Sequence, residues 1–146
     1  DNVGVIRSEK RRMLKPFYKV DPAVGKVYNF TVNIELDSNK KAVFTYFQDG
    51  QQVSGGGVVT ERNSLGIYTL NEETQKRGFL FSAATFSNHE GDCAKDFSYE
   101  VTNAGTVINI SDTDENNGTA CMIFTVSCNG EEYQSEDPQV ENKDRV

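Results

Sequence analysis

The chain has 146 residues, of which 25% are charged, and a formal net charge of -7. This length fits a single domain, residues 1–146, that can bury a core without help from metals. The acidic balance argues against a nucleic-acid partner, because binding phosphates needs a basic face. No apolar run approaches the roughly 18 residues that span a bilayer, so we expect no membrane span.

The charges are distributed unevenly along the chain. The N-terminal segment, about residues 1–25, is basic, and the C-terminal tail, about residues 129–146, is acidic. Opposite charges at the two ends can pair within one molecule or between copies, so a homo-oligomer held through charged termini is one hypothesis. Two solvated tails are the simpler interpretation, which the usual behaviour of charged termini favours.

In the first half of the chain, apolar and polar residues alternate with the period of two that is typical of β-strands. The clearest alternation begins at Tyr28 and ends at Leu36. Asp49-Gly50 predicts a hairpin, because a type I′ turn needs positive φ at both central residues. Ser54-Gly55-Gly56-Gly57 lacks the Lys and Ser/Thr of a phosphate-binding loop, so we interpret it as a flexible loop tip or a bulge. The strands predicted in this half are residues 28–36, 42–48, 51–54 and 58–61.

The second half continues in the same pattern, with weak helix signals. Residues 71–76 predict one helical turn, and residues 8–14 near the N-terminus predict two. Asn103-Ala104-Gly105 predicts a turn between two strands. The strands predicted here are residues 65–70, 78–86, 97–102, 106–110 and 120–128.

Eight or nine short strands joined mainly by tight turns predict an all-β fold with a single antiparallel domain. Because hairpin-length connections dominate, an up-and-down barrel is favoured slightly over an immunoglobulin-like two-sheet sandwich. The barrel is lipocalin-like in strand number and meander alone. The chain contains no Trp and therefore cannot carry the Gly-X-Trp signature of that family.

The pairing of the three cysteines would indicate the cellular compartment in which the protein resides. Cys121 and Cys128 lie in one predicted strand at positions of opposite parity, so they point to opposite faces and cannot form a disulfide. In a meander, Cys93 and Cys121 fall at the same end of the sheet, which predicts a Cys93–Cys121 disulfide. Cys128 is then either buried as a small apolar side chain or free for an intermolecular bond. The alternative is three reduced thiols in a cytosolic protein.

Asn29, Asn109 and Asn117 each begin an Asn-X-Ser/Thr sequence. The first two lie on polar faces of predicted strands and the third lies in a turn, so solvent is expected to reach all three for glycosylation. Together with the predicted disulfide, these sequences favour a secreted, extracellular protein.

Asp112, Asp114 and Asn116 have the alternate spacing of calcium ligands. However, the segment lacks Gly and Glu at the positions that an EF-hand loop requires. The preference of Asp and Asn for turns explains the segment better. We predict a polar hairpin loop here, and no metal.

His89, Glu90, Asp92 and Cys93 form a second compact group of potential ligands. Zinc needs four good ligands, and the chain holds no second His, so an ordinary loop is the better interpretation. Nucleophilic catalysis needs a base within reach of the nucleophile, and a single loop His is poor support for it. We therefore predict that the protein is not an enzyme and uses no cofactor.

Aromatic residues are the remaining candidates for a binding role. Strands 41–48 and 78–86 carry apolar residues on both faces. Either protein covers both faces, or one face lines an apolar cavity or contacts a partner. The candidate ligand-lining residues are Phe44, Tyr46, Phe79, Phe81, Phe97 and Tyr99.

These observations favour a secreted, non-enzymatic binding protein that holds a small apolar ligand in a β-barrel cavity. One alternative is a structural or adhesive subunit that assembles through head-to-tail contacts of its charged ends. A module that binds a host or receptor protein is the other alternative.

Overall fold

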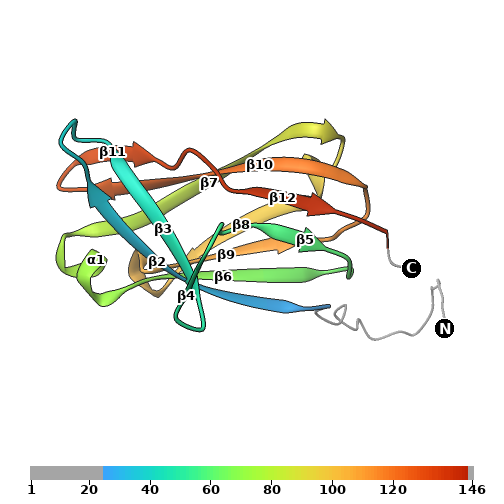
Figure 1. Cartoon of the computed structure of the whole chain (residues 1–146), viewed down its shortest axis with the longest axis horizontal. Helices are drawn as coiled ribbons and strands as arrows, with labels where there is room; N and C mark the ends of the chain where they lie inside the picture. Colours follow the sequence, from blue (N-terminus) through green and yellow to red (C-terminus); the bar gives the residue numbers. More distant parts are fainter. Residues whose placement is uncertain (1–24, 145–146) are drawn as a thin grey trace, which may run out of the picture.

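The computed structural model describes residues 25–144, and it confirms the all-β prediction. Residues 1–24, which make up nearly all of the basic segment predicted at about 1–25, lie outside the described residues, as do the helical turns predicted at 8–14. Two mixed sheets face each other across one core (Figure 1). The strands are β2 (Val27–Leu36), β3 (Ala42–Gln48), β4 (Gln51–Val53), β5 (Gly57–Val59), β6 (Ser64–Leu70), β7 (Phe79–Gly91), β8 (Phe97–Thr102), β9 (Val107–Asp112), β10 (Gly118–Cys128), β11 (Glu131–Gln134) and β12 (Gln139–Asn142). The helices are α1 (Glu72–Lys76), η1 (Ala94–Asp96) and η2 (Asn103–Gly105).

The larger sheet has the strand order β4-β3-β2-β6-β9-β8. Strands β2 and β6 run parallel, and the other pairs in this sheet are antiparallel. The β3–β4 hairpin turns through Asp49 and Gly50 with φ of 50° and 79°. Both values are positive, as the predicted type I′ turn requires.

The smaller sheet is built around the long strand β10. One edge of β10 pairs with β7 along its whole length. The other edge pairs with β12 at residues 118–121 and with β11 at residues 125–128. Strand β5 adds to β12 in parallel and forms an outer edge of this sheet.

The described strands do not close into a barrel, so the up-and-down arrangement favoured by the sequence is not formed. Hairpins connect β2 to β3, β3 to β4 and β10 to β11, each within one sheet. Five other connections cross between the sheets, because β4 and β5, β5 and β6, β6 and β7, β7 and β8, and β9 and β10 belong to different sheets. In this protein, short loops therefore do not show that consecutive strands are neighbours in the same sheet.

A β-bulge explains why the sequence of β7 is apolar on both faces. The register with β10 shifts at Ser82 and leaves this residue without a direct partner. An extra residue reverses the inward and outward alternation of a strand. Phe79 and Phe81 before the bulge and Ala84 and Phe86 after it therefore pack on the same core.

Phe124 on β10 links the two sheets. Its side chain has no exposed surface. The centroid of its ring lies 4.8 Å from that of Tyr68 and 6.2 Å from that of Tyr46, both in the larger sheet. It also lies 5.6 Å from the ring of Phe81 in its own sheet. This cluster is the centre of the core.

Helix α1 forms at the single turn predicted at residues 71–76. The Asn71 side chain caps it by accepting a hydrogen bond from the backbone N–H of Thr74 at 2.9 Å. The buried Thr74 hydroxyl accepts a hydrogen bond from the backbone N–H of Ile34 at 2.9 Å, which fixes the helix against β2. No helix within residues 25–144 has the length and apolar character needed to cross a bilayer.

The acidic C-terminal segment is not a solvated tail, which corrects the sequence prediction. Its residues 131–134 and 139–142 form β11 and β12 and pair with β10. Val140 and Asn142 are buried, at 7% and 1% exposure. The tail prediction considered charge alone and missed that Val140 and Asn142 alternate with the less buried Gln139 and Glu141.

Candidate functional site

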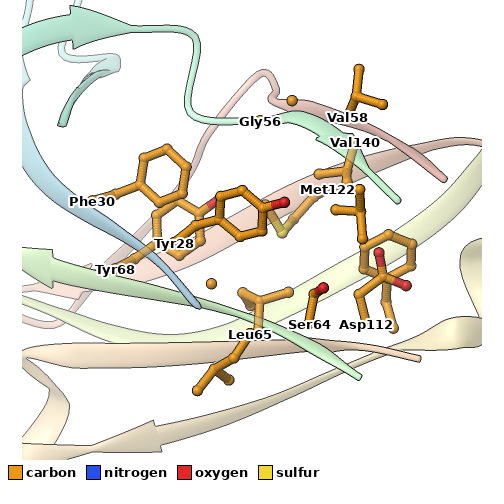
Figure 2. A pocket seen from close by; sticks show the side chains of 15 residues that line it. Tyr28, Phe30, Gly56, Val58, Ser64, Leu65, Tyr68, Asp112, Met122 and Val140 are labelled. Carbon is orange, nitrogen blue, oxygen red and sulfur yellow. The ribbon is translucent and has the colours of Figure 1, made fainter. Parts of the chain in front are cut away.

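A pocket lies between the two sheets beside β5 (Figure 2). Strands β2, β6, β8 and β9 of the larger sheet line one side, and β5, β10 and β12 of the smaller sheet line the other. Its empty volume, counting the open mouth, is ≈ 440 Å³. Because this volume includes open solvent, the enclosed part of the pocket is smaller and admits only a small chemical group. Its lining is mostly apolar, and its polar side chains are Tyr28, Ser64, Tyr68 and Asp112.

Aromatic rings form one end of the pocket, where Figure 2 shows Tyr28, Phe30 and Tyr68 together. Phe30 and Tyr68 stack with their ring centroids 4.4 Å apart. Burial raises the pKa of Tyr68, so its hydroxyl stays protonated and donates a hydrogen bond to the Gly55 carbonyl. Tyr28 is half-buried, and the Lys26 ammonium lies 5.3 Å from its ring centroid. This end offers flat apolar surfaces to a ligand.

Gly56 and Gly57 line the pocket, and the glycine run 55–57 lets the chain pass close to its neighbours. A Cβ atom on Gly56 would lie 1.9 Å from the Gln139 carbonyl oxygen. A Cβ atom on Gly55, whose φ is +88°, would lie 2.5 Å from Cδ2 of Tyr46. The run therefore has a packing role that its interpretation as a flexible loop tip did not include.

Replacing Gly56 by Ala should lower the free energy of unfolding by about 2 kcal/mol, because the added methyl group forces β5 away from β12. Chemical denaturation measures this change. Gly50→Ala is the control, since Gly50 has positive φ and no neighbour within 4 Å, and it should cost about 1 kcal/mol through the backbone alone. Equal losses in the two variants would contradict the close approach.

Asp112 and Ser64 lie at the other end of the pocket (Figure 2). Asp112 is 4% exposed. Its Oδ1 accepts hydrogen bonds from the Asp114 backbone N–H at 2.9 Å and from Asn142 Nδ2 at 3.0 Å. Its Oδ2 is buried and receives no hydrogen bond from residues 25–144. The Ser64 hydroxyl donates to the Glu61 carbonyl at 2.7 Å.

The environment of Asp112 disfavours its charged form. Burial is the largest cause that raises its pKa from the usual 3.8 to about 6, and the nearby carboxylates of Asp114 and Asp96 add to the rise. Hydrogen bonds from Asn142 and from the Asp114 backbone oppose it. A buried carboxyl with a strongly raised pKa in a pocket is a candidate functional group.

Asp96 belongs to the same buried group but has satisfied oxygens. Its Oδ2 accepts from the Asn116 backbone N–H at 2.8 Å and from Asn142 Nδ2 at 3.1 Å. Its Oδ1 accepts from Asn116 Nδ2 at 2.6 Å.

Within residues 25–144, no three His, Cys, Asp or Glu side chains are grouped so as to hold a metal ion.

The predicted ligand-lining aromatics do not gather around one cavity. Phe97 lines the pocket. Phe79, Phe81 and Tyr46 are buried in the core, and Phe44 packs partly against it. Tyr99, in contrast, is 44% exposed.

The predicted Cys93–Cys121 disulfide is not formed, and all three cysteines are free thiols. Cys93 precedes η1 and is buried in the core with no exposed surface. Cys121 alternates with the buried Ala120 and Met122, so it faces outward from β10, where Gln139 donates to its sulfur at 3.7 Å. Cys93 therefore lies in the core, whereas Cys121 lies on the outer face of β10. Cys128 is buried, and its thiol donates to the Arg77 carbonyl at 3.2 Å.

The three predicted glycosylation sites are on strands β2 and β9 and in the loop before β10. Asn29 and Asn117 are exposed, and Asn109 is half-buried. Asn117 Nδ2 donates to an oxygen of Asp144 at 3.1 Å. Their use as glycosylation sites remains a prediction.

The group around His89 is an ordinary exposed strand end in the structure. His89 and Glu90 are exposed on β7, and Asp92 pairs with Lys95 at 3.0 Å. Cys93 points into the core instead. The four side chains therefore do not share one site.

Sequence reasoning noticed Asp112 but not its surroundings. Its partner Asn142 comes from the segment interpreted as a tail, and Asp96 comes from a turn that carried no signal. The one usable signal was position, because Asp112 follows the buried residues Ile108 and Ile110 in a strand of period two. An Asp in phase with buried apolar residues is expected to face the core.

No curated protein matches the chain. The model of the DP-EP family matches residues 27–144, a range that contains every described strand and all pocket-lining residues. The chain therefore belongs to the DP-EP family.

Proposed function

We propose that this domain is a non-enzymatic binding module whose ligand site is the pocket between the two sheets. The observation that carries the proposal is the combination of an apolar, aromatic pocket with one buried, incompletely bonded carboxyl, Asp112. Such pockets hold ligands by apolar contact and orient them through a few polar groups.

The polar groups of the pocket support binding rather than nucleophilic catalysis. The Ser64 hydroxyl donates to a backbone carbonyl, so it is not held against a base. His89 is exposed on β7 and does not line the pocket. Asp112 can accept a hydrogen bond or pair with a charge, which are binding roles.

The size of the pocket refines the carrier hypothesis. The enclosed part of the pocket is much smaller than ≈ 440 Å³, because that volume includes open solvent, so the pocket fits a short stem and not a long acyl chain. We therefore propose a small ligand or a protruding side chain as the occupant.

Closing the mouth of the pocket tests the proposal. Val58 lines the pocket and is 49% exposed, so the fold should tolerate Val58→Trp while the large ring covers the opening. We expect benzylamine, titrated into the ¹⁵N-labelled protein, to shift the amide signals of Tyr28, Ser64 and Gly66 with an affinity in roughly the millimolar range. The V58W variant should bind at least tenfold more weakly.

The matched control is Val43→Trp. Val43 is 46% exposed on β3 and does not line the pocket, so V43W should bind like the unmodified protein. Shifts that spread over the surface and persist in V58W would overturn the proposal.

Secretion belongs to the same proposal and rests on the exposed sequons at Asn29 and Asn117. Expression through a eukaryotic secretory pathway, followed by glycopeptide mapping, should show glycans on both residues. Unmodified Asn29 and Asn117 would remove this support.

A further inference from the structure

We propose that the pocket recognises an ammonium or guanidinium group carried on a short apolar stem, with the Asp112 carboxylate as its counter-charge. This inference rests on the proposed function and names the chemical class of its ligand. The group can arrive on a free amine or on a lysine or arginine side chain of a protein partner, since both present the same chemistry.

Among the described residues, Asp112 has one carboxylate oxygen with hydrogen-bond donors and one without. Oδ1 accepts two hydrogen bonds, at 2.9 and 3.0 Å, while the buried Oδ2 accepts none from residues 25–144. Leaving a buried carboxylate oxygen without a donor is costly. This oxygen has almost no accessible surface, so the side chains around it must move aside to admit a ligand. A ligand N–H donor then satisfies the oxygen, and a charged donor does so more strongly than a neutral one.

The charges around Asp112 favour a cation over a neutral donor. The carboxylates of Asp96 on η1 and Asp114 after β9 both act on Asp112. Tyr28 on β2 and Cys93 before η1 also face it, and neither is cationic. The ion pairs among the described residues are Lys41–Glu136 and Lys95–Asp92, and Lys95 also acts on Asp96, but neither of these lysines pairs with Asp112.

The remaining walls of the pocket suit the stem of such a ligand. Tyr28, Phe30, Tyr68 and Phe97 present aromatic rings, which attract cations over their faces and pack against methylene groups. The aromatic end and the carboxyl end are opposite one another in Figure 2. A molecule with an apolar body and one cationic head matches both ends at once.

Benzylamine and benzyl alcohol form the test pair, because they differ only in the ammonium and the hydroxyl. Titrated into the full chain at pH 7.5 and followed by NMR, benzylamine should bind at least tenfold more tightly than benzyl alcohol. Asp112→Asn should weaken benzylamine binding at least tenfold and change benzyl alcohol binding by less than twofold. Asp49→Asn, the same change at an exposed turn residue, should alter neither.

The pH dependence provides a readout that a merely structural Asp112 would not give. Benzylamine remains an ammonium at pH 5 and pH 7.5, whereas Asp112, with a pKa of about 6, is mostly protonated at pH 5. Affinity for benzylamine should therefore fall about tenfold at pH 5 in the unmodified protein. In D112N the affinity for benzylamine should be the same at pH 5 and at pH 7.5.

Equal affinity for the amine and the alcohol, with shifts still confined to the pocket, would overturn the inference and leave the proposed function standing. Shifts at Tyr28, Ser64 and Gly66 with neither compound would overturn both. A parallel titration with the Nα-acetylated amide of lysine identifies the source, because binding that matches benzylamine indicates a protein side chain. Binding by benzylamine alone indicates a free amine, and either result supports the shared chemistry.

Discussion

Replacing Phe124 by Ala should lower the free energy of unfolding by about 3–5 kcal/mol. The Phe124 ring is fully buried and contacts the rings of Tyr46 and Tyr68 across the core as well as Phe81 beside it. Its removal loses apolar burial and leaves a cavity where the two sheets meet, which rigid rings on three sides cannot fill. Chemical denaturation at constant pH measures the loss.

Tyr99→Ala is the control for this change. It also removes an aromatic ring from a strand, but Tyr99 is 44% exposed, so its loss should cost less than about 1 kcal/mol. If F124A and Y99A lower the free energy of unfolding by the same amount, the two sheets do not pack around Phe124.

Replacing Asp112 by Asn should raise the free energy of unfolding at pH 7.5 by about 3 kcal/mol. Burial raises the pKa of Asp112 from 3.8 to about 6, so the folded state disfavours the ionised carboxyl. An Asn side chain can still accept from the Asp114 backbone and from Asn142 at its oxygen, and it carries no charge. The variant thus keeps the hydrogen bonds and loses the burial penalty.

The sign of the pH dependence follows from the same pKa. Between about pH 4 and pH 6 the folded state holds a proton on Asp112 that the unfolded state has released, so stability falls as pH rises through this window. At pH 4 the variant and the unmodified protein should differ by less than about 1 kcal/mol. Denaturation of D112N at both pH values tests this. A variant that is less stable than the unmodified protein at pH 7.5 would show that the Asp112 carboxylate stabilises the folded state, contrary to this prediction.

The two effects of D112N oppose each other, which is typical of functional residues. We expect the substitution to stabilise the fold while it weakens the binding of an amine. Because D112N should fold more stably, weak binding by this variant cannot be attributed to unfolding.

Most strands could be predicted from the sequence, because their side chains alternate with a period of two. The predicted strand at 42–48 is β3 itself, and the turn at Asp49-Gly50 has the expected positive φ at both residues. The sheet arrangement could not be predicted in this way. The length of a loop does not tell whether it stays in one sheet, and the bulge at Ser82 is visible only through the pairing of β7 with β10.

The site was harder to predict than the strands, because its residues come from distant segments. Asp96, Asp112 and Asn142 meet only when η1, β9 and β12 pack together. The aromatic residues that the sequence offered as ligand-lining are mostly core, with Phe97 the member that reaches the pocket. Counting aromatic residues identifies a core, whereas a buried polar residue within an apolar pattern identifies a site.

A crystal structure of the protein with benzylamine bound would show whether Asp112 is the counter-charge of a bound ammonium group. We expect the aromatic ring between Tyr28 and Phe97 and the nitrogen within hydrogen-bond distance of Asp112 Oδ2. Benzylamine bound only on the outer faces of the sheets, with the pocket collapsed around Asp112, would contradict this expectation.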